Sequence, residues 1–323
     1  MRTLRLVAPF LLVLLAGVLA APAQASTGPA YSVSESSLAA ALTCSKAPSK
    51  GLRPVLLVHG TTLTAATNWD WNYERAYDAQ GRPWCAVDLP RGGMGNIAVA
   101  AEYVTHAIRT MARRAVGRID VVGFSQGGML PRWSLKYWPD TRADVADLVA
   151  IDPSNYGTLD AQLICRAACP PAFWQQRTGS HFLAALNAGP DTFAGIDYTV
   201  VYTLTDEVVT PNLPPRPASA LRDGEGRRTA IAAQGICPVH LAEHLSMGTT
   251  DPVAWAVAQD ALTHAGPASA SRVPRSACLK DVMPGVDRTR LAVNLARMTA
   301  QIGTAVATSP QSTAEPSLPA YAR

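Results

Sequence analysis

The sequence has few aromatic residues, few charges and no long run of one charge sign. Phe, Trp and Tyr make up 7% of the 323 residues, and Asp, Glu, Lys and Arg make up 16%. The 28 Lys and Arg residues are scattered and the net charge is +4, which argues against a nucleic-acid or anionic-membrane surface. No segment repeats at a period of about 20 to 50 residues, which excludes solenoids and propellers. With 48% hydrophobic residues, the chain has enough apolar material for one large core or two small ones.

A long apolar run occurs only at the N-terminus. Arg2 and Arg5 precede an apolar run over residues 6–20, and the small triplet Ala-Gln-Ala follows at residues 23–25. This pattern predicts a secretory signal peptide over residues 1–25, cleaved after the triplet. The run is short for a membrane span of about 20 residues, and no later stretch is long and apolar enough. We therefore expect a secreted, extracellular protein with no integral membrane span.

Cysteine is scarce, and no CxxC pair occurs. The six cysteines all lie beyond the predicted signal peptide, and an even number in an exported chain indicates disulfides. No His stands at ligand spacing beside Cys165 or Cys169, so we expect no metal site. Cys165 and Cys169 are close enough for a local loop. The residues alone leave open how the other four pair, namely Cys44, Cys85, Cys237 and Cys278.

Short β-rich runs alternate with longer helical segments from Pro54 onward. The runs are continuous in hydrophobicity, which is typical of strands buried on both faces. They cover residues 55–58, 85–87, 119–122, 148–151 and 198–204. Helices are predicted over 98–115, where apolar residues recur every three or four positions, over 129–136, and over 251–264. This alternation predicts an α/β fold with a mostly parallel central sheet and helices on both faces.

Two segments do not follow the alternation. Residues 154–195 contain the close cysteine pair, two prolines and a polar helical stretch, and we expect them to form a lid-like insertion over the sheet. Residues 304–323 are rich in Pro, Ser, Thr and Ala, which predicts an extended C-terminal tail.

The strongest chemical signal is Gly-Phe-Ser-Gln-Gly at residues 123–127. A buried strand runs into this G-x-S-x-G motif and a helix is predicted to leave it, which is the setting of a nucleophile elbow. Gly123 and Gly127 have no Cβ to collide where strand and helix come close. Ser125 would therefore stand at the apex with its hydroxyl exposed and its backbone strained.

A serine hydroxyl needs a base, and the base needs an acid to orient it. In α/β-hydrolases these follow the serine in the order acid, then His. That order leaves His240 and His244 as bases, and position alone does not choose between them. Asp152 and Asp206 both end predicted strands and are candidate acids; Asp206 is one strand nearer the histidine loop and is better placed.

An oxyanion hole is predicted from two backbone segments. The N–H of Gln126, directly after the candidate nucleophile, is one expected donor. The loop after the strand at 55–58 supplies the other, because Gly60 lets the backbone approach the substrate. Thr61 would then give both its N–H and its hydroxyl.

The chain resembles the Candida antarctica lipase B-like secreted lipases of the α/β-hydrolase superfamily, over most of its length beyond the signal peptide. The motifs that carry this resemblance are Leu56-Leu-Val-His-Gly-Thr-Thr, Ser125-Gln-Gly-Gly with Trp133 and Tyr137-Trp-Pro, Trp174-Gln-Gln-Arg-Thr-Gly-Ser, Ala184-Ala-Leu-Asn-Ala-Gly, Thr205-Asp-Glu-Val-Val-Thr-Pro, Glu243-His and Pro319-Ala-Tyr-Ala-Arg.

The resemblance implies a role for each candidate. Ser125 becomes the nucleophile, Asp206 the acid and His244 the base, with Thr61 and Gln126 as the oxyanion hole. It also implies that three side chains bind substrate, with Asp152 and Gln175 on the acyl side of the pocket and Phe124 on the alcohol side. Disulfides Cys44–Cys85 and Cys237–Cys278 are implied too, leaving Cys165–Cys169 as a local bridge, and the tail is expected to wrap back on the body.

Three departures from the family pattern bear on the site and the tail. Phe124 stands where the family has Trp, so we expect a different alcohol-side pocket. His59 replaces a Pro. In the tail, Ala314 stands where the family has a bridging Cys.

These observations predict one α/β-hydrolase catalytic domain over residues 26–303, acting as a serine ester hydrolase through an acyl-enzyme. The expected substrate is a lipid ester, in a triacylglycerol lipase that works at a lipid–water interface as a monomer, with no cofactor and no metal. The alternatives are a carboxylesterase, polyesterase or acyltransferase on soluble short-chain esters, and a non-catalytic binding protein of the same fold.

Overall fold

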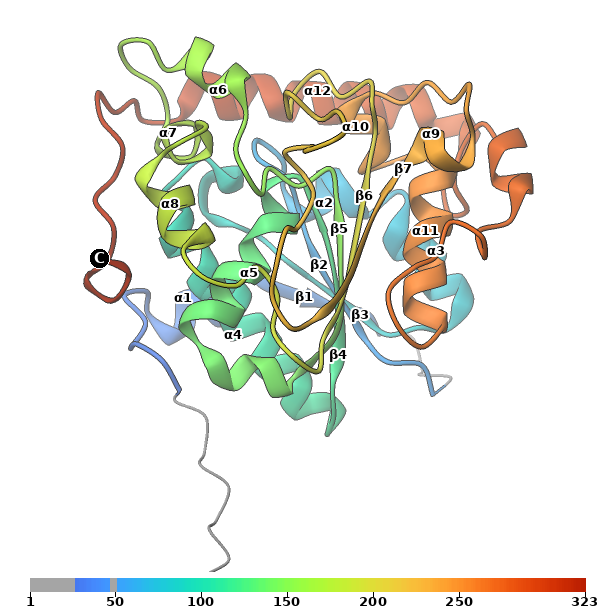
Figure 1. Ribbon diagram of the computed structural model, residues 1–323, viewed down its shortest axis with the longest axis horizontal. Coiled ribbons are helices and arrows are strands. Elements are labelled where there is room, and N and C mark those ends of the chain that lie inside the picture. Colours follow the sequence, from blue (N-terminus) through green and yellow to red (C-terminus); the bar gives the residue numbers. More distant parts are fainter. Residues whose placement is uncertain (1–26, 47–50) are drawn as a thin grey trace, which may run out of the picture.

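The architecture is a central sheet flanked by helices, as the computed structural model of the chain shows (Figure 1). The structure describes residues 27–46 and 51–323. The predicted signal peptide over residues 1–25 therefore lies outside the described residues.

Within these ranges seven strands form one sheet, in the order β1-β3-β2-β4-β5-β6-β7. β1 pairs with β3 antiparallel and all other neighbours pair parallel. The strands are β1 (Leu42–Cys44), β2 (Val55–Val58), β3 (Trp84–Val87), β4 (Ile119–Phe124), β5 (Val145–Ile151), β6 (Asp197–Tyr202) and β7 (Arg227–Ala232). The five predicted runs correspond to β2 through β6. The sequence pattern does not predict β1, which is three residues long, or β7, which begins with three polar residues and has only one buried residue.

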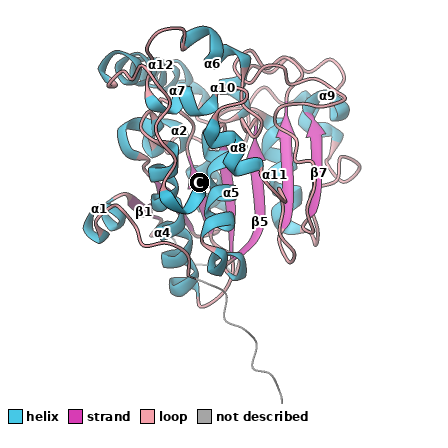
Figure 2. Cartoon of the chain, turned by 60° about the vertical axis from the view of Figure 1, so that its left-hand side comes forward, coloured by secondary structure: helices cyan, strands magenta, loops and turns pink. Residues whose placement is uncertain are grey.

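Helices cover both faces of the sheet (Figure 2). They are α1 (Glu35–Ala40), α2 (Ala65–Trp69), α3 (Tyr73–Gln80), α4 (Ile97–Ala115), α5 (Gln126–Tyr137), α6 (Leu159–Ile164), α7 (Pro171–Gln176), α8 (His181–Asn187), α9 (Ala233–Ile236), α10 (His244–Met247), α11 (Pro252–Thr263) and α12 (Leu291–Thr308). No helix among the described residues is long and apolar enough to cross a membrane.

Alternate residues of the central strands enter two different cores. Val55 and Leu57 of β2 pack with α3 and α11, and Leu56 and Val58 pack with α4 and α5 on the opposite face. All four are fully buried. A strand covered on both faces has no polar side, which explains the unbroken hydrophobic runs in the sequence.

The insertion and the tail both lie against the body of the fold. Helices α6, α7 and α8 fall between β5 and β6, within residues 154–195. α12 crosses above the sheet in Figure 1, near α6 and α10. It continues to Thr308, so residues 304–308 of the predicted extended tail are helical; the helix ends before Pro310, which disfavours helical backbone at the residue before it. Beyond it, Tyr321 contacts Trp133 and Trp138, and Glu315 accepts hydrogen bonds at the start of α8.

Three disulfides tie loops and strands together. Cys44 and Cys85 are direct partners across β1 and β3. Cys165–Cys169 closes a short loop after α6, and Cys237–Cys278 joins the segment before α10 to the 3₁₀ turn Arg275–Leu279. These are the pairs that the resemblance implies.

Candidate active site

Ser125 occupies a sharp turn between β4 and α5. Its backbone has φ 54° and ψ −123°, a conformation that is strained for a residue with a Cβ. The turn closes because Gly127 has no side chain: a Cβ there would lie 2.2 Å from the carbonyl oxygen of Val58. This strained serine between a buried strand and a helix is the elbow that the motif predicts.

His244 and Asp206 form a buried hydrogen-bonded pair. His244 Nδ1 donates to Asp206 Oδ2 at 3.1 Å, and the two residues are 3% and 8% exposed. Asp206 Oδ1 accepts from the backbone N–H groups of Val208 and Val209. Burial alone would raise the pKa of Asp206, but His244 and these N–H donors together hold the pKa below its ordinary value.

The hydrogen bond to Asp206 determines which ring nitrogen of His244 is free to accept a proton. With Nδ1 directed at the carboxylate, Nε2 is the nitrogen left to accept a proton. Ser125 and His244 line the same cavity, although no hydrogen bond joins the serine hydroxyl to the ring in this structure. Nucleophile–base hydrogen bonds are often long without substrate and tighten in the reacting complex.

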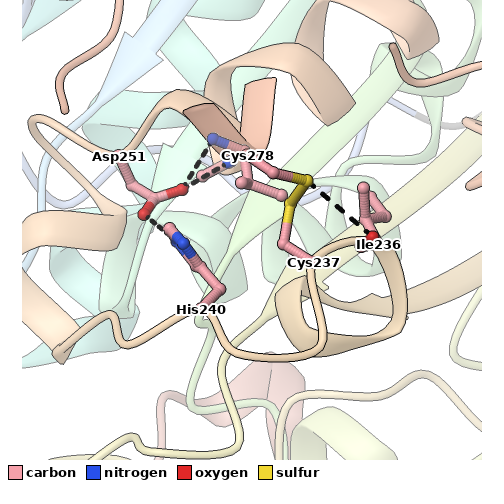
Figure 3. The surroundings of a disulfide bond; sticks show 7 residues. Ile236, Cys237, His240, Asp251 and Cys278 are labelled. Carbon is pink, nitrogen blue, oxygen red and sulfur yellow. Dashed lines mark hydrogen bonds and ion pairs between the residues drawn. A yellow bond between two sulfur atoms is a disulfide. The ribbon is translucent and has the colours of Figure 1, made fainter. Parts of the chain in front are cut away.

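His240, the other candidate base, lies in a different cluster. Its Nε2 is 2.5 Å from Oδ2 of Asp251, near the Cys237–Cys278 bridge (Figure 3). The other oxygen of Asp251 caps the N-terminus of α11. His240 is thus held by a helix cap and does not line the cavity that contains Ser125.

Thr61 and Gln126 meet beside Ser125. Thr61 Oγ1 accepts hydrogen bonds from Nε2 of Gln126 at 3.2 Å and from Nε2 of Gln176 at 3.1 Å. With its acceptor positions used by two amide donors, the Thr61 hydroxyl keeps its proton for another partner. The N–H of Gln126 begins α5, where a helix has no internal acceptor for it. These groups are donors suited to an oxyanion.

A cavity of about 270 Å³ opens at these residues. Its polar lining residues include Ser125, His244 and Thr61, together with Thr62, Ser154, Thr158, Asp160, Gln176 and Glu207. The rest of the wall is largely apolar and comes from α6, α7, α12 and nearby segments, with Ala161, Ile164, Phe173, Val209, Leu245 and Ile302. A larger cavity of about 700 Å³ lies at the amino ends of the strands, around Arg53 and Arg118, and it includes neither the serine nor the histidine.

Two predicted pocket residues are placed elsewhere by the structure. Asp152 and Gln175 do not line the cavity, and both are fully buried. Gln175 accepts from the N–H of Ile97 and donates to Asn96, so it anchors the start of α4. The carboxyl group of Asp152 lies near Asp206 and His244 and accepts a hydrogen bond from the backbone N–H of Thr203, and its backbone has a positive φ of 41°.

Ser154 and Gln176 line the cavity instead. Ser154 donates to Gln176 Oε1 at 2.9 Å, and Gln176 donates to Thr61. The spacing within α7 could have indicated Gln176. Phe173 and Gln176 stand three residues apart and therefore share one face of the helix, whereas Gln175 lies on another face. No sequence pattern pointed to Ser154.

Phe124, which the resemblance implies as a pocket residue, lines the same cavity as Ser125 and His244. Its ring lies 4.8 Å from the imidazole of His244, between centroids. A Cβ on Gly248 would lie 2.3 Å from the Phe124 ring, so this glycine gives the aromatic side chain its space. Phe124 therefore supports the histidine as well as bounding the cavity.

Asp152, Asp206 and His244 each offer an atom within 4.8 Å of the others, the spacing that a metal ion needs. All three are buried, and the hydrogen bond between His244 and Asp206 already uses atoms that an ion would require. The three residues thus form a hydrogen-bonded histidine–carboxylate pair with a second carboxyl group nearby.

Comparison with known proteins agrees with this geometry. Residues 52–230 match the family Lipase (class 2). Lipase B of Pseudozyma antarctica is 32% identical over 302 residues, covering 91% of this chain and 86% of that protein. The crystal structure of Aspergillus fumigatus lipase B superposes with a TM-score of 0.85 at 29% identity, covering 93% of this chain and 74% of that one. Bacillus licheniformis lipase BlEst2 in its propeptide form, at 14% identity and a TM-score of 0.52 over 71% of this chain and 54% of that one, shares the fold alone.

The parallel sheet with flanking helices and the strained serine after β4 define an α/β-hydrolase. Within that class the chain belongs to the class 2 lipase family. It is an ester hydrolase of the lipase and esterase type.

Proposed function

We propose that the protein is a secreted lipase that hydrolyses carboxylic esters of lipids, with Ser125 as nucleophile, His244 as base and Asp206 as acid. The observation that carries this proposal is the His244–Asp206 hydrogen bond of 3.1 Å beside a cavity that also contains Ser125. Thr61 and Gln126 are the oxyanion donors.

The reaction proceeds in two half-reactions. Ser125 Oγ attacks the ester carbonyl while His244 Nε2 takes the hydroxyl proton, and the carbonyl oxygen becomes an oxyanion held by Thr61 and Gln126. The tetrahedral intermediate then collapses, the alcohol leaves with the proton from His244, and the acyl group stays on Ser125. Water repeats the sequence on the acyl-enzyme and releases the acid. Asp206 stabilises the positive imidazolium in both halves.

The surroundings of the cavity mouth support a lipid substrate. Leu163 and Ile164 of α6 are 60% and 55% exposed, and Ile164 also lines the cavity. Val208, which lines the cavity as well, is 39% exposed. Apolar side chains grouped at the entrance of a site favour contact with a lipid surface.

Replacing Ser125 with Ala tests the nucleophile. We expect loss of ester turnover, loss of labelling by a fluorophosphonate probe, and an unchanged thermal melting curve. Wild-type turnover in this variant would contradict the assignment. If the wild-type chain neither turns over esters nor takes the probe, it is instead a non-catalytic member of the fold.

The size of the cavity favours a second candidate, a carboxylesterase acting on short acyl chains. Its volume of about 270 Å³ lies just below the range of about 300–1,000 Å³ that is usual for small-molecule sites. Comparing kcat/KM on emulsified long-chain triglyceride and on a dissolved butyrate ester separates the two. A lipase is faster on the emulsion, and an esterase is faster on the dissolved ester.

Secretion is proposed from the N-terminal pattern and from three disulfides, which persist in oxidising compartments. Mass spectrometry of the protein from culture medium tests it. We expect an N-terminus at Ser26. Retention in the cell with Met1 still present would contradict secretion.

A further inference from the structure

Two buried carboxyl groups lie close together beside the imidazole of His244. Asp152 follows β5 and Asp206 follows β6, the neighbouring parallel strand, so both side chains leave the same edge of the sheet. Oxygen atoms of the two groups and a ring nitrogen of His244 lie within 4.8 Å of one another. Asp152 is 0% exposed.

The hydrogen bonds around Asp152 are unequal between its two oxygens. Oδ1 accepts from the backbone N–H of Thr203 at 2.9 Å and from Asn212 Nδ2 at 3.4 Å. The same amide nitrogen donates to Asp206 Oδ2 at 3.3 Å. Oδ2 of Asp152 is buried and has no donor among the described residues. A buried carboxylate oxygen with no donor is costly, whereas a protonated one is itself a donor.

The charges nearby do not balance two carboxylates. No Lys or Arg in the described ranges forms an ion pair with Asp152 or Asp206. Of the other titratable groups around the pair, His244 contacts Asp206, Asp251 is occupied by His240, and Glu207 is exposed and accepts the backbone N–H of His244. Two neighbouring buried carboxyl groups repel each other when both are charged, and the one histidine beside them contacts only Asp206, so ionisation of a single group is favoured.

We propose that Asp152 is a positioning residue: a neutral carboxylic acid that donates a hydrogen bond from Oδ2 to the carboxylate of Asp206. This inference rests on the proposed triad and adds a fourth member to it. The bond supplements the N–H groups of Val208 and Val209 in fixing the Asp206 plane toward His244, and it leaves one negative charge in the pair. Burial, and next the charge of Asp206, raise the pKa of Asp152 well above the ordinary range, in agreement with this state.

The proposal predicts different effects on turnover for Asp152→Asn and Asp152→Leu. In Asp152→Asn, the amide oxygen can accept from Thr203 and the amide nitrogen can donate to Asp206, so both contacts and the zero charge are kept. In Asp152→Leu, which has a similar size, the donor is lost. Asp206 then carries its full charge opposite the imidazole and is less firmly oriented.

The experiment is the pH dependence of kcat/KM on a dissolved ester for both variants of the full chain, with thermal melting measured alongside. For Asp152→Asn we expect turnover near wild type and an unmoved midpoint of the acidic limb. For Asp152→Leu we expect kcat lower by roughly 10- to 100-fold, KM little changed, and the midpoint moved to higher pH, because the imidazolium is held more strongly. Asp144→Asn, just before β5 at its other end, is the control and should move neither quantity.

Two results would overturn the proposal. A midpoint in Asp152→Asn lower by roughly two pH units shows that Asp152 is ionised, since removing a unit charge at this distance weakens the imidazolium by that amount. A folded Asp152→Leu with wild-type kcat and midpoint shows that Asp152 does not position Asp206. If Asp152→Leu does not fold, the midpoint of the acidic limb in Asp152→Asn decides the question. Failure of the triad itself would appear separately, as turnover in Ser125→Ala.

Discussion

Gly123 and Gly127 lie in direct backbone contact across the turn that carries Ser125. A Cβ placed on Gly123 would be 2.1 Å from the carbonyl oxygen of Gly127 and 2.7 Å from the nitrogen of Gly128. Both atoms are backbone and cannot rotate away. The last part of β4 and the first turn of α5 can therefore approach as they do only with glycine at this position.

Gly123→Ala should consequently displace Ser125 and destabilise the fold. Overpacking costs about 1–3 kcal/mol where side chains can adjust, and here the obstacle is main chain, so we expect at least the upper part of that range. Ester turnover should fall with stability. Chemical denaturation and initial rates measure both effects.

Gly235→Ala in α9 is the matched control, because nothing lies within 4 Å of a Cβ at that position. It should be neutral, or stabilising by up to about 1 kcal/mol, as alanine favours helix over glycine. Equal losses in the two variants would show that the contact at Gly123 is not the cause.

The sequence predicts those features of the fold that depend on a few neighbouring residues. The unbroken runs around Leu56 and Val121 predicted buried parallel strands, and the motif around Ser125 predicted the strained turn, since in each case the requirement lies within a few residues. Strand order alone favours Asp206 over Asp152 as the acid, and in the structure Asp206 is hydrogen-bonded to His244.

Features that depend on the orientation of a side chain, or on contacts between distant segments, could not be predicted in this way. The residues alone leave both His240 and His244 as candidate bases, because they stand four positions apart, and only the family resemblance selects His244. In the structure His240 contacts Asp251. The resemblance implies Gln175 as a pocket residue, whereas Gln176 lines the cavity; a shift of one residue turns a side chain by about 100° around a helix. The resemblance also places Asp152 at the pocket, whereas in the structure Asp152 is buried near Asp206 and does not line the cavity.

The Thr61 hydroxyl should contribute strongly to turnover. Because its oxygen already accepts from Gln126 and Gln176, its proton is directed to a third partner, and Thr61→Val removes that donor while keeping the shape. We expect kcat to fall by roughly a hundred- to a thousandfold with little change in KM. Thr61→Ser keeps the hydroxyl and should retain most activity; a similar loss in both variants would assign the effect to packing of the methyl group.

The disulfides should differ in their contribution to stability. Cys237–Cys278 spans 41 residues and Cys165–Cys169 spans 4. Loop-closure entropy predicts a loss of about 4 kcal/mol for the long bridge and about 2 kcal/mol for the short one when each pair is replaced by alanine. Urea unfolding of the two double variants measures the difference. A larger loss from the short bridge would mean that it stabilises the folded insertion through contacts and not through chain entropy.

The pair His240–Asp251 should make stability depend on pH. The hydrogen bond to Asp251 raises the pKa of His240 above its ordinary value of 6.5 in spite of the opposing effect of burial. Its contribution to folding is therefore fully present below about pH 6.5 and is lost as the pH rises through the higher value of the folded state.

The difference in melting temperature between wild type and His240→Gln measures this contribution. We expect wild type to be more stable at pH 5.5 and the gap to narrow steadily toward pH 9. Val239→Gln, at a neighbouring side chain that is 93% exposed, should give a difference that does not vary with pH. A gap that instead widened with rising pH would mean that His240 is held neutral in the folded protein, and that its contact with Asp251 is made by an uncharged ring.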